Sequence, residues 1–173
     1  MKSRHSRIYA YMALGGATLA VVFHVCSFLG LSLPPGAMIL HLGIFLLVIP
    51  AAKKALSSKH IGLRDLLRRI PRLSTVILIV AAFYAPAQFG YRSLKLGAAF
   101  PEERDGRYQL VSRGSVVQEL SADEYAYANA LDARMWSAYW FCAYWCLFVY
   151  FQWTEAALEF MERIPPHTGS RAE

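Results

Sequence analysis

Residues 8–52 read IYAYMALGGATLAVVFHVCSFLGLSLPPGAMILHLGIFLLVIPAA and contain no Asp, Glu, Lys or Arg. This uncharged run of 45 residues is about twice the roughly 20 apolar residues that a helix needs to cross a bilayer. Leu33-Pro34-Pro35-Gly36 interrupts the run with residues that end helices and favour turns. The run therefore predicts a hairpin of two membrane-spanning helices, at 9–31 and 37–53.

Two further uncharged runs, of 19 and 20 residues, cover 73–91 and 135–154. They predict spans at 73–93 and 134–154. Only 17% of the chain is charged, whereas soluble domains carry about 25%. This composition excludes a secreted disulfide scaffold, a disordered chain and a nucleic-acid-binding protein, despite the net charge of +6. We expect an all-α membrane protein of one domain (1–173), with four transmembrane helices in two antiparallel hairpins.

Basic residues predict how these spans are oriented. Three precede residue 8, seven lie in 53–72, and none lies in the turn at 32–36. Since Lys and Arg concentrate in cytoplasmic loops, we expect both termini in the cytoplasm and 94–133 in the periplasm or outside the cell. The first apolar run is longer than that of a signal peptide, which predicts an uncleaved first span. We expect the protein in a bacterial inner membrane.

The inner segment 54–72 has apolar and basic residues at helical spacing, which predicts an amphipathic helix lying on the inner membrane face. The basic residues expected to contact anionic lipid are Arg64, Arg68, Arg69 and Arg72. The alternative is that this helix binds an acidic cytosolic partner.

The outer segment predicts a β-hairpin at 108–120, because two β-prone stretches flank a turn that contains Gly114. Ser121 and Glu124 then form a capping box, which predicts the start of a helix. No Gly or Pro follows until Pro165, so we expect one helix over 122–164 that extends beyond the bilayer. The hairpin residues expected to contact a partner are Tyr108, Leu110 and Val116.

Candidate ligating residues lie in the predicted spans. Ionisable groups inside a bilayer often mark function, and His24 and His41 are expected at one depth on neighbouring helices, with Cys26 and Cys142 near that depth. Facing histidines can ligate haem iron, and His with Cys can hold copper or zinc. The alternative is structural, since such residues also join and pack membrane helices.

The span number resembles that of the quinone-linked membrane disulfide oxidoreductases, whose exchanging cysteine pairs lie in outer loops. Cys26, Cys142 and Cys146 all lie within predicted spans, so no catalytic residue is carried over. Tyr144 and Trp145 are placed mid-span, where their polar atoms need partners. They are expected to contact another helix, a protein partner, a lipid or a bound quinone ring.

No phosphate-binding loop, nucleophile elbow or zinc-protease helix occurs in the sequence. The first hypothesis is a non-catalytic inner-membrane protein without a cofactor, acting as an accessory subunit or as a protective or regulatory factor. Its expected partners are lipids and a membrane protein or a second copy. The alternative is a redox protein binding haem or metal through His24 and His41. A transporter is less favoured, because internal repeats and buried midplane charges are missing from the sequence.

Overall fold

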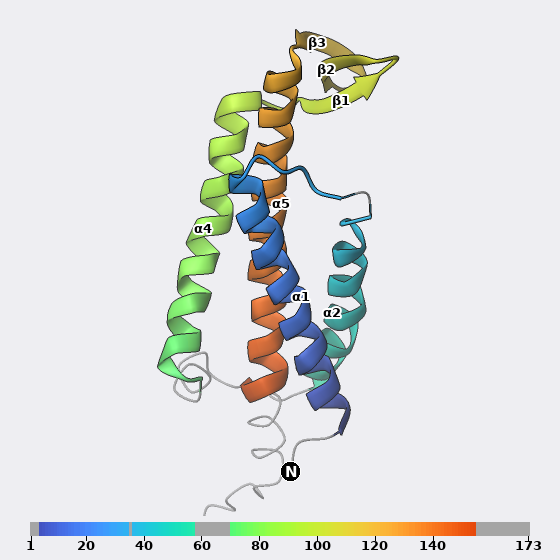
Figure 1. Cartoon of the computed structure of the whole chain (residues 1–173). Coiled ribbons are helices and arrows are strands. Elements are labelled where there is room, and N and C mark those ends of the chain that lie inside the picture. Colours follow the sequence, from blue (N-terminus) through green and yellow to red (C-terminus); the bar gives the residue numbers. More distant parts are fainter. Residues whose placement is uncertain (1–3, 35, 58–69, 155–173) are drawn as a thin grey trace, which may run out of the picture.

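The computed structural model describes residues 4–34, 36–57 and 70–154, and within them it contains four α-helices and a three-stranded sheet (Figure 1). The helices are α1 (Arg4–Phe28), α2 (Ile39–Ser57), α4 (Arg72–Leu96) and α5 (Ala122–Val149), and α5 continues into a π-helical turn, η1 (Tyr150–Thr154). The strands are β1 (Phe100–Arg104), β2 (Arg107–Ser112) and β3 (Ser115–Leu120).

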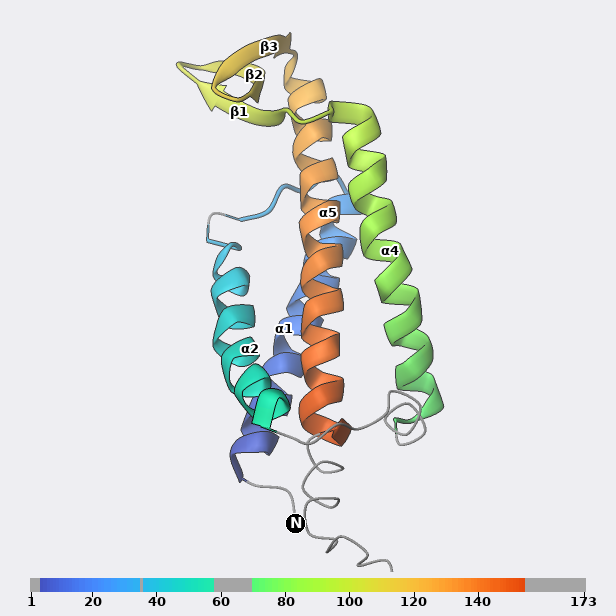
Figure 2. The same cartoon turned by 180° about the vertical axis from the view of Figure 1, so that it is seen from behind.

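The four helices run up and down in turn, and the sheet lies beyond one end of them (Figures 1 and 2). We call this the sheet end, and the end that contains Arg4 and Thr154 the terminal end. Helices α4 and α5 extend further than α1 and α2 at the sheet end. The sheet is therefore attached to α4 and α5 alone among the helices.

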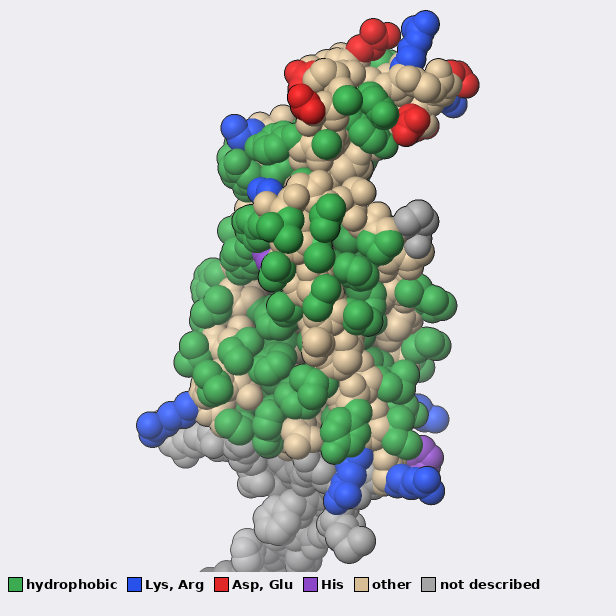
Figure 3. All heavy atoms as spheres, viewed as in Figure 1, with side chains coloured by type: hydrophobic (Ala, Val, Ile, Leu, Met, Phe, Trp, Pro, Cys, Tyr) green, Lys and Arg blue, Asp and Glu red, His purple; other side chains and the backbone are tan. Residues whose placement is uncertain are grey.

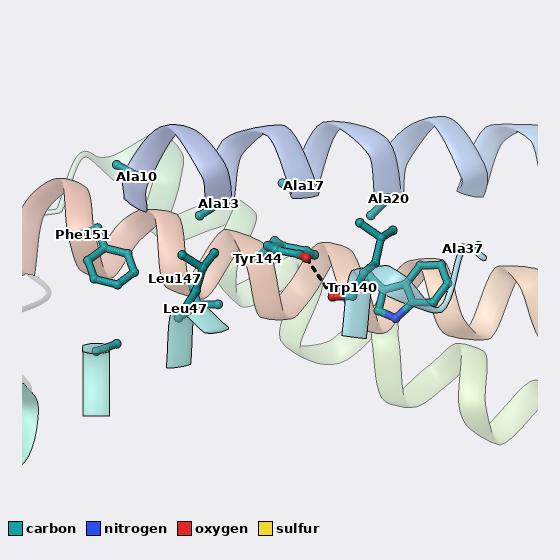
Figure 4. Packing of buried hydrophobic residues seen from close by; sticks show 12 residues of the cluster. Ala10, Ala13, Ala17, Ala20, Ala37, Leu47, Trp140, Tyr144, Leu147 and Phe151 are labelled. Atoms are coloured by element: carbon teal, nitrogen blue, oxygen red, sulfur yellow. Dashed lines mark hydrogen bonds between the residues drawn. The ribbon is translucent and has the colours of Figure 1, made fainter. Parts of the chain in front are cut away.

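The main core lies between α1 and α5 (Figure 4). Small residues of α1 at heptad spacing face large residues of α5 and η1 at the same spacing. The small residues are Ala10, Ala13, Ala17 and Ala20, and the large ones are Trp140, Tyr144, Leu147 and Phe151. Small side chains let two helix backbones approach closely, which is how membrane helices commonly pack. The sequence analysis did not identify this pairing.

Helix α1 ends at a glycine C-cap before the predicted Pro-Pro turn. Gly30 has a φ of +78°, and its N–H donates to the Ser27 carbonyl while the Leu31 N–H donates to the Cys26 carbonyl. This is a Schellman motif, which satisfies the last carbonyls of the helix. The helical hairpin is thus opened by Gly30, while the predicted breaker at 33–36 lies within the connection to α2.

The predicted hairpin at 108–120 is confirmed as β2 and β3, which pair antiparallel through a two-residue turn at Arg113 and Gly114. Both turn residues have positive φ, as tight hairpin turns require. Strand β1 was not predicted. It pairs with β2 through a second such turn, Asp105-Gly106. The expectation of an all-α protein with one hairpin is therefore corrected to a mostly helical protein with a three-stranded sheet.

The predicted start of the long helix is confirmed. Ser121 caps α5 by accepting from the Glu124 N–H, and the Glu124 carboxylate accepts from the Ser121 N–H at 2.8 Å. The helix is α-helical to Val149 and becomes π-helical at Tyr150. The remainder of the predicted helix, 155–164, lies outside the described residues.

Two helices, α1 and α4, are long and apolar enough to cross a membrane by length and composition. In α2 the apolar part, Ile39–Lys53, is shorter. The uncharged part of α5 is rich in Trp and Tyr, whose polar atoms lower its hydropathy, and α5 does not meet the same criterion. The predicted inner helix at 54–72 falls mainly on 58–69, outside the described residues; α2 continues to Ser57, and Arg72 begins α4.

Candidate functional site

His24 lies at a polar contact between α1, α4 and α5. Its Nδ1 is 2.8 Å from the Ser137 hydroxyl and its Nε2 is 2.7 Å from the Tyr84 hydroxyl. Ser137 in turn donates to the Ala133 carbonyl at 2.6 Å. Since the single Ser137 proton is used there, His24 donates from Nδ1 to Ser137 and accepts from Tyr84 at Nε2. Both ring nitrogens of a neutral His24 are therefore occupied by protein groups.

His41 makes a different set of contacts, between α2 and α5. The Trp140 indole N–H donates to His41 Nδ1 at 3.1 Å. The imidazole also packs edge-on against Trp136, with ring centroids 4.9 Å apart. Among the described residues no hydrogen bond or ring contact joins His41 to His24, so the structure gives the two predicted ligands separate partners.

Among the described residues, no hydrogen bond or ring contact joins His24 or His41 to the cysteines Cys26 and Cys142 of the predicted metal set. Cys26 and Cys142 are partly buried, Cys146 is exposed, and all three are free thiols. Within residues 4–34, 36–57 and 70–154, no group of three or more His, Cys, Asp or Glu side chains is placed to hold a metal ion.

Tyr144 lies inside the bundle, with 3% of its surface exposed. Its hydroxyl donates to the Leu40 carbonyl of α2 at 2.8 Å, a bond drawn in Figure 4. Its ring lies against Gly16 of α1, where an added Cβ would come within 2.5–2.6 Å of the ring carbons. Gly43 of α2 similarly leaves space for the Tyr144 hydroxyl. Tyr144 thus joins α1, α2 and α5.

Trp145, which follows Tyr144 in α5, faces the other side of the helix. Its indole N–H donates to the Ser74 carbonyl of α4 at 3.3 Å. Tyr144 and Trp145 together connect α5 to each of the other three described helices.

Arg92 and Asp132 form a buried ion pair where α4 and α5 meet the sheet. Arg92 Nε donates to the Asp132 carboxylate at 2.7 Å, and the two side chains are 4% and 16% exposed. The other guanidinium nitrogens donate to the carbonyls of Gly97, at 2.8 Å, and Ala99. These carbonyls belong to the turn between α4 and β1. Arg92 therefore fixes the start of the sheet to both helices.

Arg134 has a related role at the end of α1. Its Nη2 donates to the Ser27 carbonyl at 3.1 Å, and its guanidinium lies 4.5 Å from the Phe28 ring centre. A cation at this place stabilises the negative end of the α1 helix dipole.

The predicted partner contacts of the hairpin divide between the two faces of the sheet. Tyr108 stacks on Tyr125 of α5 with ring centroids 4.5 Å apart, and Leu110 is buried against α5. Val116 and the adjacent Val117 are 48% and 59% exposed. Val116 lies opposite Val111, and Val117 lies at a register irregularity of the β2–β3 pairing, between the pairs Val111–Val116 and Leu110–Gln118. Val116 and Val117 thus form an exposed apolar surface on β3.

Of the predicted lipid-contacting arginines, Arg64, Arg68 and Arg69 lie outside the described residues, and Arg72 is exposed at the first position of α4. The capping box perturbs one carboxyl group at the sheet end. The Ser121 backbone N–H, and secondly the Ser121 hydroxyl, hold the pKa of Glu124 below its usual value by hydrogen bonding to the carboxylate.

Arg92 and Asp132 were not predicted as functional residues from the sequence. A signal for them existed, because Arg92 directly follows the uncharged run 73–91 and Asp132 lies just before the run 135–154. Their antiparallel helices bring these two boundary charges to one level. From the sequence, Arg92 was placed at the outer end of the span 73–93 and Asp132 in the solvated loop 94–133, so the two were not expected to pair.

No protein-family model, curated protein or solved structure matches this chain.

Proposed function

We propose that this chain is a non-catalytic, four-span membrane protein that presents its three-stranded sheet to a protein partner on the outer side of the membrane. The observation on which this rests is the Arg92 junction, because a sheet bonded through Arg92 to α4 and α5 is held in a fixed position relative to the helices. A fixed surface loses little conformational entropy when a partner binds.

The charge distribution supports four spans. In Figure 3 the charged side chains gather at the two ends, basic at the terminal end and mostly acidic around the sheet, with an apolar belt between them. All four described helices pass through this belt (Figure 1). Membrane proteins typically combine an apolar belt with an excess of Lys and Arg at its cytoplasmic end.

The length of α2 fits this proposal if its flanking residues reach the interface. The apolar part Ile39–Lys53 covers about 22 Å at 1.5 Å per residue, less than a typical 30 Å hydrocarbon core. Short spans are accommodated by local thinning and by long basic side chains that extend to the headgroups. Lys53 lies at the inner boundary of the apolar part of α2. Its side chain is exposed, so it is free to extend to the headgroups.

The docking surface we propose is the exposed valine pair of β3, Val116 and Val117. Edge strands are usually protected by charges or Pro. Strand β1 has this protection, in Pro101 and the charged residues that follow it. Strand β3 lacks Pro and Lys and carries one charged residue, Glu119. The unprotected edge is thus the one that carries the exposed valines.

The test places a photo-crosslinking amino acid at Val117 of the full chain in native membranes, with a matched position at Glu102 on the opposite edge. We expect one discrete adduct from position 117 and none of that mass from 102. Val116→Ser should reduce the adduct without changing protein level, because it removes apolar contact area. An identical adduct pattern from both edges, or none from 117, would show that β3 is not a docking surface.

A further inference from the structure

A cavity of about 210 Å³ lies where α4, α5 and β1 meet. Its lining residues come from all three elements and are Phe89, Arg92, Phe100, Met135, Trp136 and Tyr139. The His24 contact with Tyr84 and Ser137 shares none of these residues. The cavity is therefore a separate feature of the sheet end.

The volume limits what the cavity can hold. An engineered apolar cavity of about 150 Å³ binds benzene. A volume of about 210 Å³ accepts one ring with small substituents, but not the four-ring macrocycle of haem.

The walls favour a flat ring. Four of the six lining residues are aromatic, and Phe89 and Tyr139 are perpendicular to each other, with ring centroids 6.5 Å apart. Aromatic rings prefer such edge-to-face or offset contacts with another ring. Phe89 and Tyr139 are also 51% and 40% exposed. Because they lie next to the apolar belt, a ligand can enter from the membrane.

Arg92 supplies the only charged group of the lining. A guanidinium has five N–H groups, and the three acceptors of Arg92 in the described residues are Asp132, Gly97 and Ala99. Two N–H groups therefore remain for a ligand acceptor. Since the Asp132 carboxylate already neutralises the guanidinium charge, a neutral carbonyl suits this position better than a phosphate anion.

We propose that this cavity binds the ring of a neutral, membrane-soluble carbonyl compound of the quinone class, with a ring carbonyl accepting a hydrogen bond from Arg92. The aromatic walls hold the ring, and any isoprenoid chain extends past Phe89 and Tyr139 into the lipid. The site rests on the proposed placement of α4 and α5 in the membrane, but it does not depend on the partner proposed for β3. It binds the ring without any change in the oxidation state of the protein.

The experiment uses the purified full chain in phosphatidylcholine nanodiscs. The probe is an azido-benzoquinone with one isoprenoid unit, and adducts are mapped by mass spectrometry after irradiation. We expect saturable labelling confined to 89–92, Phe100 and 135–139, with competition by the unlabelled quinone. Phe89→Ala should weaken the apparent affinity at least tenfold. The matched control is Phe83→Ala, on the same helix, exposed and outside the cavity lining, and it should change the affinity less than twofold.

Tyr139→Leu is a second cavity variant, and circular dichroism checks that each variant keeps its helices. A competitor in which both carbonyls are replaced by methoxy groups should bind at least tenfold more weakly than the quinone. Equal competition by that compound or by a plain alkane would show that the cavity takes any hydrocarbon, and the proposal would be wrong. Unsaturable labelling spread over the apolar belt, or equal effects of Phe83→Ala and Phe89→Ala, would overturn it too.

Discussion

Arg92 is the residue whose replacement should most affect the junction between helices and sheet. Arg92→Met leaves the Asp132 carboxylate buried without its cation and removes the donors to the Gly97 and Ala99 carbonyls. Removing one partner of a buried ion pair typically costs roughly 3–5 kcal/mol. We expect a loss of that size in the free energy of unfolding, measured by denaturant titration in mild detergent.

The control is the exposed ion pair of the sheet. Arg107 Nη1 lies 3.7 Å from the Glu119 carboxylate, and both side chains are largely exposed. Exposed pairs contribute about 1 kcal/mol or less, so Glu119→Gln should change the unfolding free energy little. If Arg92→Met cost no more than Glu119→Gln, the proposed role of the buried pair would be wrong.

Replacing the neighbouring residues Gly15 and Gly16 of α1 by Ala should have different effects on the free energy of unfolding. A Cβ at Gly16 would come within 2.5–2.6 Å of the Tyr144 ring, whereas a Cβ at Gly15 meets no atom within 4 Å. Overpacking of a filled interior costs about 1–3 kcal/mol. We therefore expect Gly16→Ala to lower the unfolding free energy by that amount and Gly15→Ala to leave it unchanged or slightly raised. If both substitutions lowered the unfolding free energy equally, the contact between Tyr144 and α1 would be wrong.

Gly43 permits a sharper test of the same contact, because an added Cβ there would meet the Tyr144 hydroxyl first. Tyr144→Phe alone loses the hydrogen bond to Leu40, worth about 1 kcal/mol. In the Gly43→Ala background the same change removes the clash. A double-mutant cycle should therefore show that Tyr144→Phe is less harmful, or even stabilising, when Gly43 is Ala. Additive effects would contradict this contact.

At the scale of elements, the stability of the first turn of α5 should depend on pH. Hydrogen bonds from Ser121 lower the pKa of Glu124 in the folded state. A lowered pKa means that the cap stabilises the helix above the pKa of the unfolded chain and loses this effect as the pH falls through the folded value. We expect the protection of the first-turn amides, measured as their exchange rate relative to that of an unfolded chain at the same pH, to fall over that acidic range. Carboxyl NMR should show a higher Glu124 pKa in Ser121→Ala, and an identical pKa in both proteins would refute the capping assignment.

At the scale of the whole molecule, three positions distinguish four spans from two. With four spans, Arg4 and Lys53 lie on one side of the membrane and Arg113 on the other. If α1 and α4 alone crossed, Arg4 would share its side with Arg113. Single cysteines at these positions, with Cys26, Cys142 and Cys146 changed to Ala, can be labelled by a membrane-impermeant maleimide. We expect Arg113→Cys to react in intact cells and the other two to react after permeabilisation.

The sequence by itself determined the features that depend on neighbouring residues. The break between the first two helices, the Arg113-Gly114 turn and the Ser121 cap follow from backbone preferences and hydrogen bonds within a few residues. Helices α1, α2 and α4 and the second half of α5 likewise follow from the long uncharged runs 8–52, 73–91 and 135–154, although Pro50 lies inside α2 and Pro86 inside α4. Strand β1 was missed because it contains Pro101 and three charged residues, although its Asp105-Gly106 turn is a hairpin signal.

Only the tertiary structure decided which distant groups meet. His24 could have faced His41, but it bonds to Ser137 and Tyr84 instead. Arg92 reaches Asp132, and Tyr144 fits against Gly16, because the heptad pairing of α1 with α5 and the antiparallel packing of α4 set the rotation and level of each helix. Helical periodicity identifies the residues on one face of a helix. It does not fix which helix that face will contact, since this depends on the packing of the whole bundle.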